Sequence, residues 1–276
     1  MGRDDRRPGG LGHADRPRAA GDRDQAALAA AYDREWSDDH AGQPYQAFWH
    51  FPDSARDLAE RWLGPLHGRR LLELAPGDGA TTVRLAEQGA TVIAAELSRG
   101  GLRTLLRRCE AAGVPGTVAP LQADVQHLPL ADRSVDLVYG ENFLMYVDPG
   151  LVGRECARVL RPGGRVVLIE PTAHHPLVKL YRRVGSPYRA TAPRYFALAD
   201  IARLAAPFAA VRHREFYLTT VLALPLVRWP RLFEAGFRAL NGLDRLLSIA
   251  IPPLRRFGWL TVIELVAAAE SEGSGG

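Results

Sequence analysis

Between residues 70 and 171, short apolar runs alternate with helical patterns, and this alternation restricts the fold more than any other feature. A tight turn cannot join parallel strands, so the strand–helix–strand order favours a parallel sheet with helices on both faces. Ligands bind such sheets at the carboxyl ends of the strands. We expect strands at residues 70–74, 91–96, 117–123, 135–139 and 165–170, with helices at 81–87, 101–112 and 151–160.

The composition indicates an ordinary globular protein. The 276 residues are 47% hydrophobic and 24% charged, which excludes a mostly disordered, collagen-like or disulfide-stapled chain. The two cysteines, Cys109 and Cys156, lie far apart and lack the spacing of metal ligands. We therefore expect buried thiols in a reducing compartment and no metal site.

Charge and hydropathy restrict the partners and the location of the chain. The net charge is +4, but arginines are interspersed with acids almost everywhere, so we expect no nucleic-acid partner. No apolar run reaches the roughly 18 residues of a membrane span, and the N-terminus is charged where a signal peptide has its apolar core. The prediction is a cytoplasmic protein that acts on a small molecule.

The N-terminal region divides into two parts. Residues 1–24 carry both charges and almost nothing apolar, so we expect a disordered tail ahead of one domain over residues 25–276. Helical patterns begin at Gln25 and return over residues 53–63, which predicts a helical cap at 25–66. The aromatic segment between them, with Tyr45 and Trp49, either roofs the core or lines a pocket.

The loop after the first expected strand is rich in glycine. It reads Glu73-Leu74-Ala75-Pro76-Gly77-Asp78-Gly79, in which two glycines let the backbone approach a ligand closely. The three-glycine spacing of dinucleotide-binding loops fails at Ala75 and Ala80 in one alignment and at Thr82 in the other. This disfavours a nicotinamide-dependent oxidoreductase, and no Gly-Lys-Ser/Thr motif indicates a phosphate-binding loop.

Acidic residues end the next two strands. Glu96 follows the glycine loop by about twenty residues, where a carboxylate can accept both hydroxyls of a ribose. Asp124 ends the third strand, where an acid can accept a hydrogen bond from an adenine amino group. Either residue alone is explained equally well as a helix cap or strand-end acid. The occurrence of both acids at successive strand ends, in register with the glycine loop, favours a nucleoside site.

Taken together, these motifs resemble the class I S-adenosylmethionine-dependent methyltransferases, particularly the small-molecule, type 11-like branch that includes ubiquinone and menaquinone enzymes. The resemblance covers roughly residues 55–171 and implies a Rossmann-like α/β fold. Its seven-stranded sheet would be mostly parallel with one antiparallel strand, the last two strands lying near 209–218 and 260–268. The motifs that carry it are residues 73–79, 96–98, 124–125, 128–130 with 134–138, and 160–165.

The resemblance also implies S-adenosylmethionine as the cofactor and assigns residues to it. Gly77 and Gly79 would lie against its methionine part and ribose, and Glu73 would help to hold its amino group. Glu96 would accept from the ribose hydroxyls. Asp124 would accept from the adenine amino group, beside the backbone of Val125. The full expected set is Glu73, Ala75, Gly77, Gly79, Glu96, Leu97, Asp124, Val125 and Glu141.

Two departures from the family bear on the substrate. Many relatives carry a paired histidine after the fourth strand, whereas this chain has residues 141–146, Glu-Asn-Phe-Leu-Met-Tyr. The last two strands are separated by residues 223–259, with apolar side chains at helical spacing, where relatives have a short turn. This apolar helical insertion is a lid, a homodimer interface or a membrane contact.

A basic insertion at residues 172–200 follows the fifth strand, and its part from 172 to 195 contains no acid. It is either a solvated face or an anion site, because guanidinium groups grip phosphate or carboxylate in a bidentate way. The candidate substrate-binding residues are Tyr45, Trp49, Lys179, Arg182, Arg183 and Arg189. With the apolar insertion they favour an amphiphilic metabolite, such as a prenyl diphosphate or an acidic intermediate of secondary metabolism.

The expected activity is C- or O-methylation of this metabolite, with Glu141, Tyr146, His174 and His175 as candidate bases. For each of these, packing or hydrogen bonding is an equally good explanation. Two alternatives keep the cofactor without methyl transfer: assistance of a cyclisation, and a non-catalytic scaffold.

Overall fold

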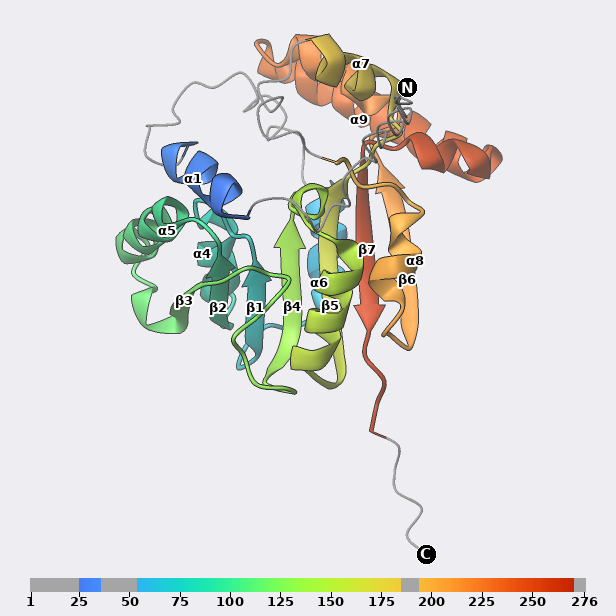
Figure 1. Ribbon diagram of the computed structural model, residues 1–276. Coiled ribbons are helices and arrows are strands. Elements are labelled where there is room, and N and C mark those ends of the chain that lie inside the picture. The colour runs from blue at the N-terminus through green and yellow to red at the C-terminus, as the bar shows by residue number, and fades with distance from the viewer. Residues whose placement is uncertain (1–24, 36–53, 185–193, 271–276) are drawn as a thin grey trace, which may run out of the picture.

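The computed structural model describes residues 25–35, 54–184 and 194–270 (Figure 1). These residues form a seven-stranded sheet in the order β3-β2-β1-β4-β5-β7-β6. β7 runs antiparallel to both of its neighbours, and the pairs among β1 to β5 are parallel. The strands are β1 (Arg70–Leu74), β2 (Thr91–Glu96), β3 (Val118–Gln122), β4 (Val135–Glu141), β5 (Leu160–Pro171), β6 (Ala210–Phe216) and β7 (Leu260–Val266).

The helices lie between the strands and beyond their ends. The α-helices are α1 (Gln25–Glu35), α3 (Ser54–Leu63), α4 (Ala80–Glu87), α5 (Arg99–Ala111), α6 (Pro149–Val159), α7 (Pro176–Val184), α8 (Asp200–Ala205) and α9 (Pro230–Ala250). Short 3₁₀ helices are η2 (Pro115–Thr117), η3 (Leu144–Tyr146), η5 (Thr220–Leu226) and η6 (Pro252–Phe257). Among the described residues, no helix is both long enough and apolar enough to cross a membrane.

The sheet separates two clusters of buried side chains. On one face, α3, α4 and α5 bury residues such as Leu58, Leu85 and Leu105 against the strands. On the other face, α6 and α8 bury Val152 and Leu204. The central strands therefore contact apolar side chains on both sides, which is why they read as continuous apolar runs in the sequence.

The observed topology confirms the predicted fold class, including the reversed last strand. β1 and β2 have the expected bounds, and the final pair lies where it was predicted. β5 begins at Leu160 rather than at residue 165, because residues 160–164 continue along β4 through a register shift. Cys109 and Cys156 are buried free thiols, as expected.

The C-terminal helices lie at the end of the molecule where the parallel strands end (Figure 1). The insertion between β6 and β7 consists of η5, α9 and η6. Buried Asp244 of α9 ties it to the segment that follows β6, because its carboxylate accepts from the amides of Leu218 and Thr219 at 2.9 and 2.7 Å. The hydroxyls of Thr219 and Thr220 donate to the same carboxylate.

Candidate functional site

The loop between β1 and α4 turns through left-handed backbone. Ala75, Gly77 and Gly79 have φ values of 50°, 58° and 77°. Gly79 is the N-cap of α4, and a Cβ atom there would lie 2.7 Å from Cγ of Leu105 on α5. Gly79 therefore permits the left-handed turn, and it also permits the close packing of α5 on the loop.

We expect Gly79→Ala to lower the free energy of unfolding by about 2–4 kcal/mol, from the left-handed backbone and the clash together. Gly113→Ala is the matched control, because Gly113 has a φ of 73° with nothing within 4 Å of the built Cβ. It should cost only about 1 kcal/mol. Denaturant melts of both variants measure the difference in the free energy of unfolding. Equal decreases in the two variants would show that the Leu105 side chain moves to accommodate the added methyl group.

Glu96 joins the ends of β1 and β2. Its side chain is buried, and its two carboxylate oxygens accept from the amides of Ser98 at 2.9 Å and Gly77 at 3.2 Å. Burial raises the pKa of Glu96, and these amides oppose the rise. A Cβ at Gly101 would lie 3.1 Å from Cγ of Glu96, so α5 begins close against the carboxylate because a glycine stands there.

Helix α1 adds a residue that the sequence analysis missed. Asp33 accepts from the Ser98 hydroxyl at 2.7 Å and from the Gly100 amide at 2.8 Å. The Gly100 amide is the main cause that lowers the pKa of Asp33. The rings of Tyr32 and Tyr146 pack edge to face, 5.7 Å apart. Thus α1 lies against the first turn of α5 and against η3, although no spacing in the sequence links it to either.

Asp124 and Val125 follow β3. The Asp124 carboxylate accepts from the amide and the side chain of Gln126, at 2.9 and 3.2 Å. Gln126 in turn accepts from the amide of Asp148 at 2.9 Å. The acid therefore organises a local turn, which is the structural alternative considered for it, and Val125 beside it is buried.

Glu73 and Glu141 lie at the ends of neighbouring strands. Glu73 is buried, accepts from the Thr82 hydroxyl at 2.6 Å, and has its pKa raised to about 8 by burial. Glu141 accepts from Arg56 of α3, Nε to Oε1 at 3.3 Å and Nη2 to Oε2 at 3.2 Å. The Tyr139 hydroxyl also donates to Glu141. Both oxygens of Glu141 are therefore bonded within the protein.

Glu170, which ends β5, was also missed. It is fully buried and accepts from the amides of Phe143 and Leu144 at 3.1 and 3.2 Å. Burial raises its pKa to about 8. These bonds hold the segment after β4 in place, with Asn142 at a φ of 59°. The sequence signal that could have identified Glu170 is its position: like Glu96 and Asp124, it is an acid at the end of an expected strand.

The remaining candidate bases differ in their surroundings. His174 is exposed. His175 is buried, with Nε2 2.8 Å from the Leu218 carbonyl oxygen and Nδ1 accepting from the Val178 amide at 3.3 Å. Burial lowers its pKa, which favours the neutral ring. Tyr146 is buried beneath α1. His175 therefore starts α7, while Tyr146 and His174 retain their places as candidates.

Among the residues of the basic insertion that the structure describes, one cation is partly buried, Arg182. Nη1 of Arg182 donates to the Thr172 carbonyl at 2.7 Å, and its guanidinium carbon lies 3.5 Å from the centre of the Tyr195 ring. Burial lowers the pKa of Arg182 to about 10, so it is still charged at neutral pH. Lys179 and Arg183 are exposed. Tyr45, Trp49 and Arg189 lie outside the described residues.

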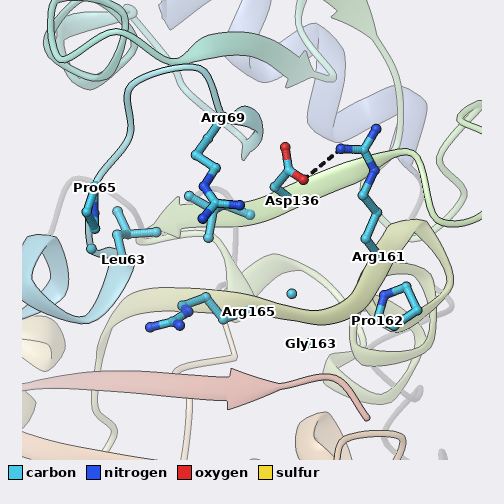
Figure 2. A pocket seen from close by; sticks show the side chains of 11 residues that line it. Leu63, Pro65, Arg69, Asp136, Arg161, Pro162, Gly163 and Arg165 are labelled. Atoms are coloured by element: carbon cyan, nitrogen blue, oxygen red, sulfur yellow. Dashed lines mark hydrogen bonds and ion pairs between the residues drawn. The ribbon is translucent and has the colours of Figure 1, made fainter. Parts of the chain in front are cut away.

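A pocket of about 170 Å³ lies at the opposite end of the sheet (Figure 2). It is lined by Arg69, Asp136, Arg161 and Arg165, among others, and Arg161 pairs with Asp136 at 2.7 Å. None of the predicted cofactor or substrate residues lines it.

The residues at the strand ends fit S-adenosylmethionine. A nucleoside with a ribose diol and an ammonium group requires carboxylate acceptors and close approach to backbone. Glu96, Glu73 and the glycine loop supply these on adjacent strands.

Comparisons with known proteins identify a methyltransferase domain in this chain. Residues 72–168 match the methyltransferase domain family. An uncharacterized methyltransferase of Mycobacterium tuberculosis (strain ATCC 25618 / H37Rv) is 34% identical over 187 residues, covering 64% of this chain and 69% of that protein. The demethylmenaquinone methyltransferase of Clavibacter sepedonicus is 38% identical over 149 residues, covering 52% of this chain and 58% of the relative.

Solved structures share the fold at low sequence identity. The [4+2]-cyclase SpnF has a TM-score of 0.60 at 16% identity, covering 90% of this chain and 98% of its own. Geranyl diphosphate C-methyltransferase from Streptomyces coelicolor A3(2), in complex with Mg²⁺, geranyl diphosphate and S-adenosyl-L-homocysteine, has a TM-score of 0.58 at 17% identity, covering 88% and 97%. The nicotinamide alternative is therefore set aside. The chain belongs to the class I S-adenosylmethionine-dependent methyltransferases.

Proposed function

We propose that this enzyme methylates a carbon or an oxygen of a small, largely apolar metabolite that carries an anionic group. The observation that carries this proposal is Arg182, a partly buried guanidinium just beyond the carboxyl end of β5. Within the described residues no carboxylate pairs with it, and its bonds go to a carbonyl and an aromatic ring. A desolvated cation at the ligand end of the sheet favours an anionic partner.

We propose that the cofactor is held by the residues expected from the family. Glu96 accepts from the ribose hydroxyls, Glu73 holds the ammonium group, and Gly77 and Gly79 lie against the methionine and ribose. The remaining proposed cofactor-site residues lie near the adenine or next to the residues just named; they are Ala75, Leu97, Asp124, Val125 and Glu141. Because Arg56 and Tyr139 already bond Glu141, we assign it to shaping the wall of this site.

When bound, the cofactor supplies an electrophilic methyl group on a sulfonium. The protein then acts mainly by positioning, which can be worth about 7–11 kcal/mol. Buried Phe143, Met145 and Tyr146 are apolar or aromatic side chains suited to a hydrocarbon substrate, and Glu170 fixes their segment. A base is needed only where a proton must leave. Tyr146 and His174 are our candidates, because His175 bonds through both ring nitrogens.

Relatives support an apolar substrate. The names of two of them refer to geranyl diphosphate and to demethylmenaquinone, one an isoprenoid diphosphate and the other a quinone. By extension we propose a role in secondary metabolism. We further propose that residues 25–276 act as one domain, since the described elements from α3 to β7 share one sheet and the two buried clusters on its faces. We also propose that the protein acts in the cytoplasm and has no nucleic-acid partner.

A matched pair of substrates tests the proposal. We expect methyl transfer, measured as S-adenosylhomocysteine release, to geranyl diphosphate or a related acidic amphiphile and much less to the uncharged alcohol. Neutralising Arg182 and Arg183 together should raise the KM of the anion about 10- to 100-fold, the effect of losing charge-assisted bonds. The KM of the cofactor should stay unchanged.

Arg107→Gln on α5 is the control, because it removes an exposed arginine away from the insertion. Equal effects on both KM values, or none, would assign the basic insertion to a solvated face. Transfer to uncharged substrates alone would reject the anionic group.

Cofactor-assisted cyclisation is a second candidate, favoured by the structural similarity to SpnF. The two activities differ in the product: methyl transfer adds one methyl group, and cyclisation leaves the methyl count unchanged. Mass spectrometry of the product distinguishes them. A chain that binds S-adenosylhomocysteine but converts none of the candidates would support the scaffold alternative.

A further inference from the structure

Exposed apolar side chains gather at one end of the described part of the molecule. α7 and α9 both lie beyond the carboxyl ends of the parallel strands (Figure 1). Val178 of α7 belongs to the same buried cluster as Phe233 and Phe237 of α9. The exposed large apolar residues on or beside α7, η5 and α9 are Leu177, Leu180, Tyr181, Leu222, Trp229, Leu232, Leu243, Leu246, Ile249 and Ile251; elsewhere they are Leu106 and Val211.

Helix α9 carries three parallel stripes of side chains. At about 100° per residue, the three stripes are rotated from one another by about a third of a turn. The stripes are buried Phe233, Phe237 and Asp244; exposed Leu232, Leu243 and Leu246; and exposed Arg231, Arg238 and Arg245. The leucine stripe is largely open, since Leu243 and Leu246 are 42% and 66% exposed. Amphipathic helices that lie in lipid interfaces combine an apolar face with arginines and lysines on the polar face, and these two exposed stripes share that combination.

The charge around this apolar stripe is almost entirely positive. Between residues 228 and 256 the exposed cations are Arg228, Arg231, Arg238, Arg245, Arg255 and Arg256. The two acids in this range are Glu234, which lies 3.9 Å from Arg238, and Asp244, which is buried and bonded to residues 218–220. α7 adds exposed Lys179 and Arg183. A partner for this surface must therefore be both apolar and anionic.

We propose that the α9 face, meaning the exposed residues of α7, α9 and η6, binds the surface of an anionic lipid membrane. The leucines enter the boundary of the acyl chains, and the arginines reach the phosphates of the headgroups. A second copy of this chain fits less well, because a two-fold dimer through this face would set its arginines against the same arginines. The proposal does not depend on the substrate.

Vesicle flotation tests this proposal with the full chain. We expect binding to vesicles of phosphatidylcholine with about 30% phosphatidylglycerol, and at least tenfold weaker binding to phosphatidylcholine alone or at high salt. Leu243→Gln with Leu246→Gln should weaken binding at least tenfold, whereas Leu106→Gln on α5 should not. Arg238→Gln with Arg245→Gln should weaken it about tenfold or more, whereas Arg69→Gln with Arg107→Gln should not.

Calorimetry with S-adenosylhomocysteine checks that each variant stays folded, since cofactor affinity should not change. Equal binding of wild type and all variants, or no binding to anionic vesicles, would overturn the proposal. A second result would also overturn it: no vesicle binding, together with a lipid-free dimer in sedimentation velocity that the double variant Leu243→Gln with Leu246→Gln abolishes. That result would assign the face to self-association.

Discussion

Replacing Glu96 by glutamine is expected to weaken the binding of S-adenosylhomocysteine about 100-fold. The carboxylate would accept from both ribose hydroxyls, and charge-assisted hydrogen bonds contribute about 1.5–3 kcal/mol each. The amide keeps one acceptor oxygen, so about 3 kcal/mol in total is lost. Isothermal titration calorimetry measures the affinity, and the methyltransferase rate at saturating cofactor should fall much less.

Glu96 also bonds the amides of Gly77 and Ser98, so the fold of the variant must be checked by its melting curve. Glu87→Gln is the matched control, because it makes the same chemical change at an exposed position. It should leave the affinity unchanged. A folded Glu96→Gln protein with wild-type affinity would remove Glu96 from the cofactor site.

Cofactor affinity is expected to rise about tenfold per pH unit between pH 6 and 7.5. Burial raises the pKa of Glu73 from 4.5 to about 8, so the carboxyl group is neutral in the free protein across this range. An ammonium group placed beside it favours the carboxylate, and binding then releases one proton. Glu73→Gln should abolish the pH dependence and lower the affinity at pH 7.5.

Titration in two buffers of different ionisation enthalpy measures the released proton directly. Glu170→Gln is the control, because the pKa of Glu170 is also raised to about 8, yet Glu170 is not among the proposed cofactor ligands. That variant should still release the proton. Proton release that persists in Glu73→Gln, or that disappears in Glu170→Gln, would contradict the assignment of Glu73.

The same pKa has a consequence for stability that needs no cofactor. The unfolded chain ionises Glu73 near pH 4.5, whereas the folded chain keeps it neutral to about pH 8. In that window the unfolded state binds fewer protons, so the free energy of unfolding falls as the pH rises. Glu73→Gln should reduce this fall, which denaturant melts at pH 5 and pH 8 can show.

The backbone of the site was predictable from the sequence because its signals are local. Gly77 and Gly79 indicate a turn that needs left-handed backbone, and Glu96 lies at the end of an apolar run. Parallel strands bring their carboxyl ends to one edge, so strand-end residues meet without further information. The bounds of β1 and β2 and the reversed β7 followed from apolar patterning and the family motifs.

The contacts that complete the site were not predictable in this way. Asp33 reaches Ser98, and Arg56 reaches Glu141, across 65 and 85 residues. Neither pair has a spacing that a helix or strand period would reveal. The buried states of Glu73 and Glu170 likewise depend on which helices cover them, and the side-chain type alone gives no pKa.

The sequence by itself determined the family, the parallel sheet and the edge at which we propose that the cofactor binds, because each depends on short-range patterns and strand order. Only the tertiary structure decided which acids are neutral, which candidate bases are already bonded, and that the leucines of α9 face outward between arginines and core. These properties arise from burial and from contacts between distant segments, and burial is a property of the packed molecule rather than of any segment.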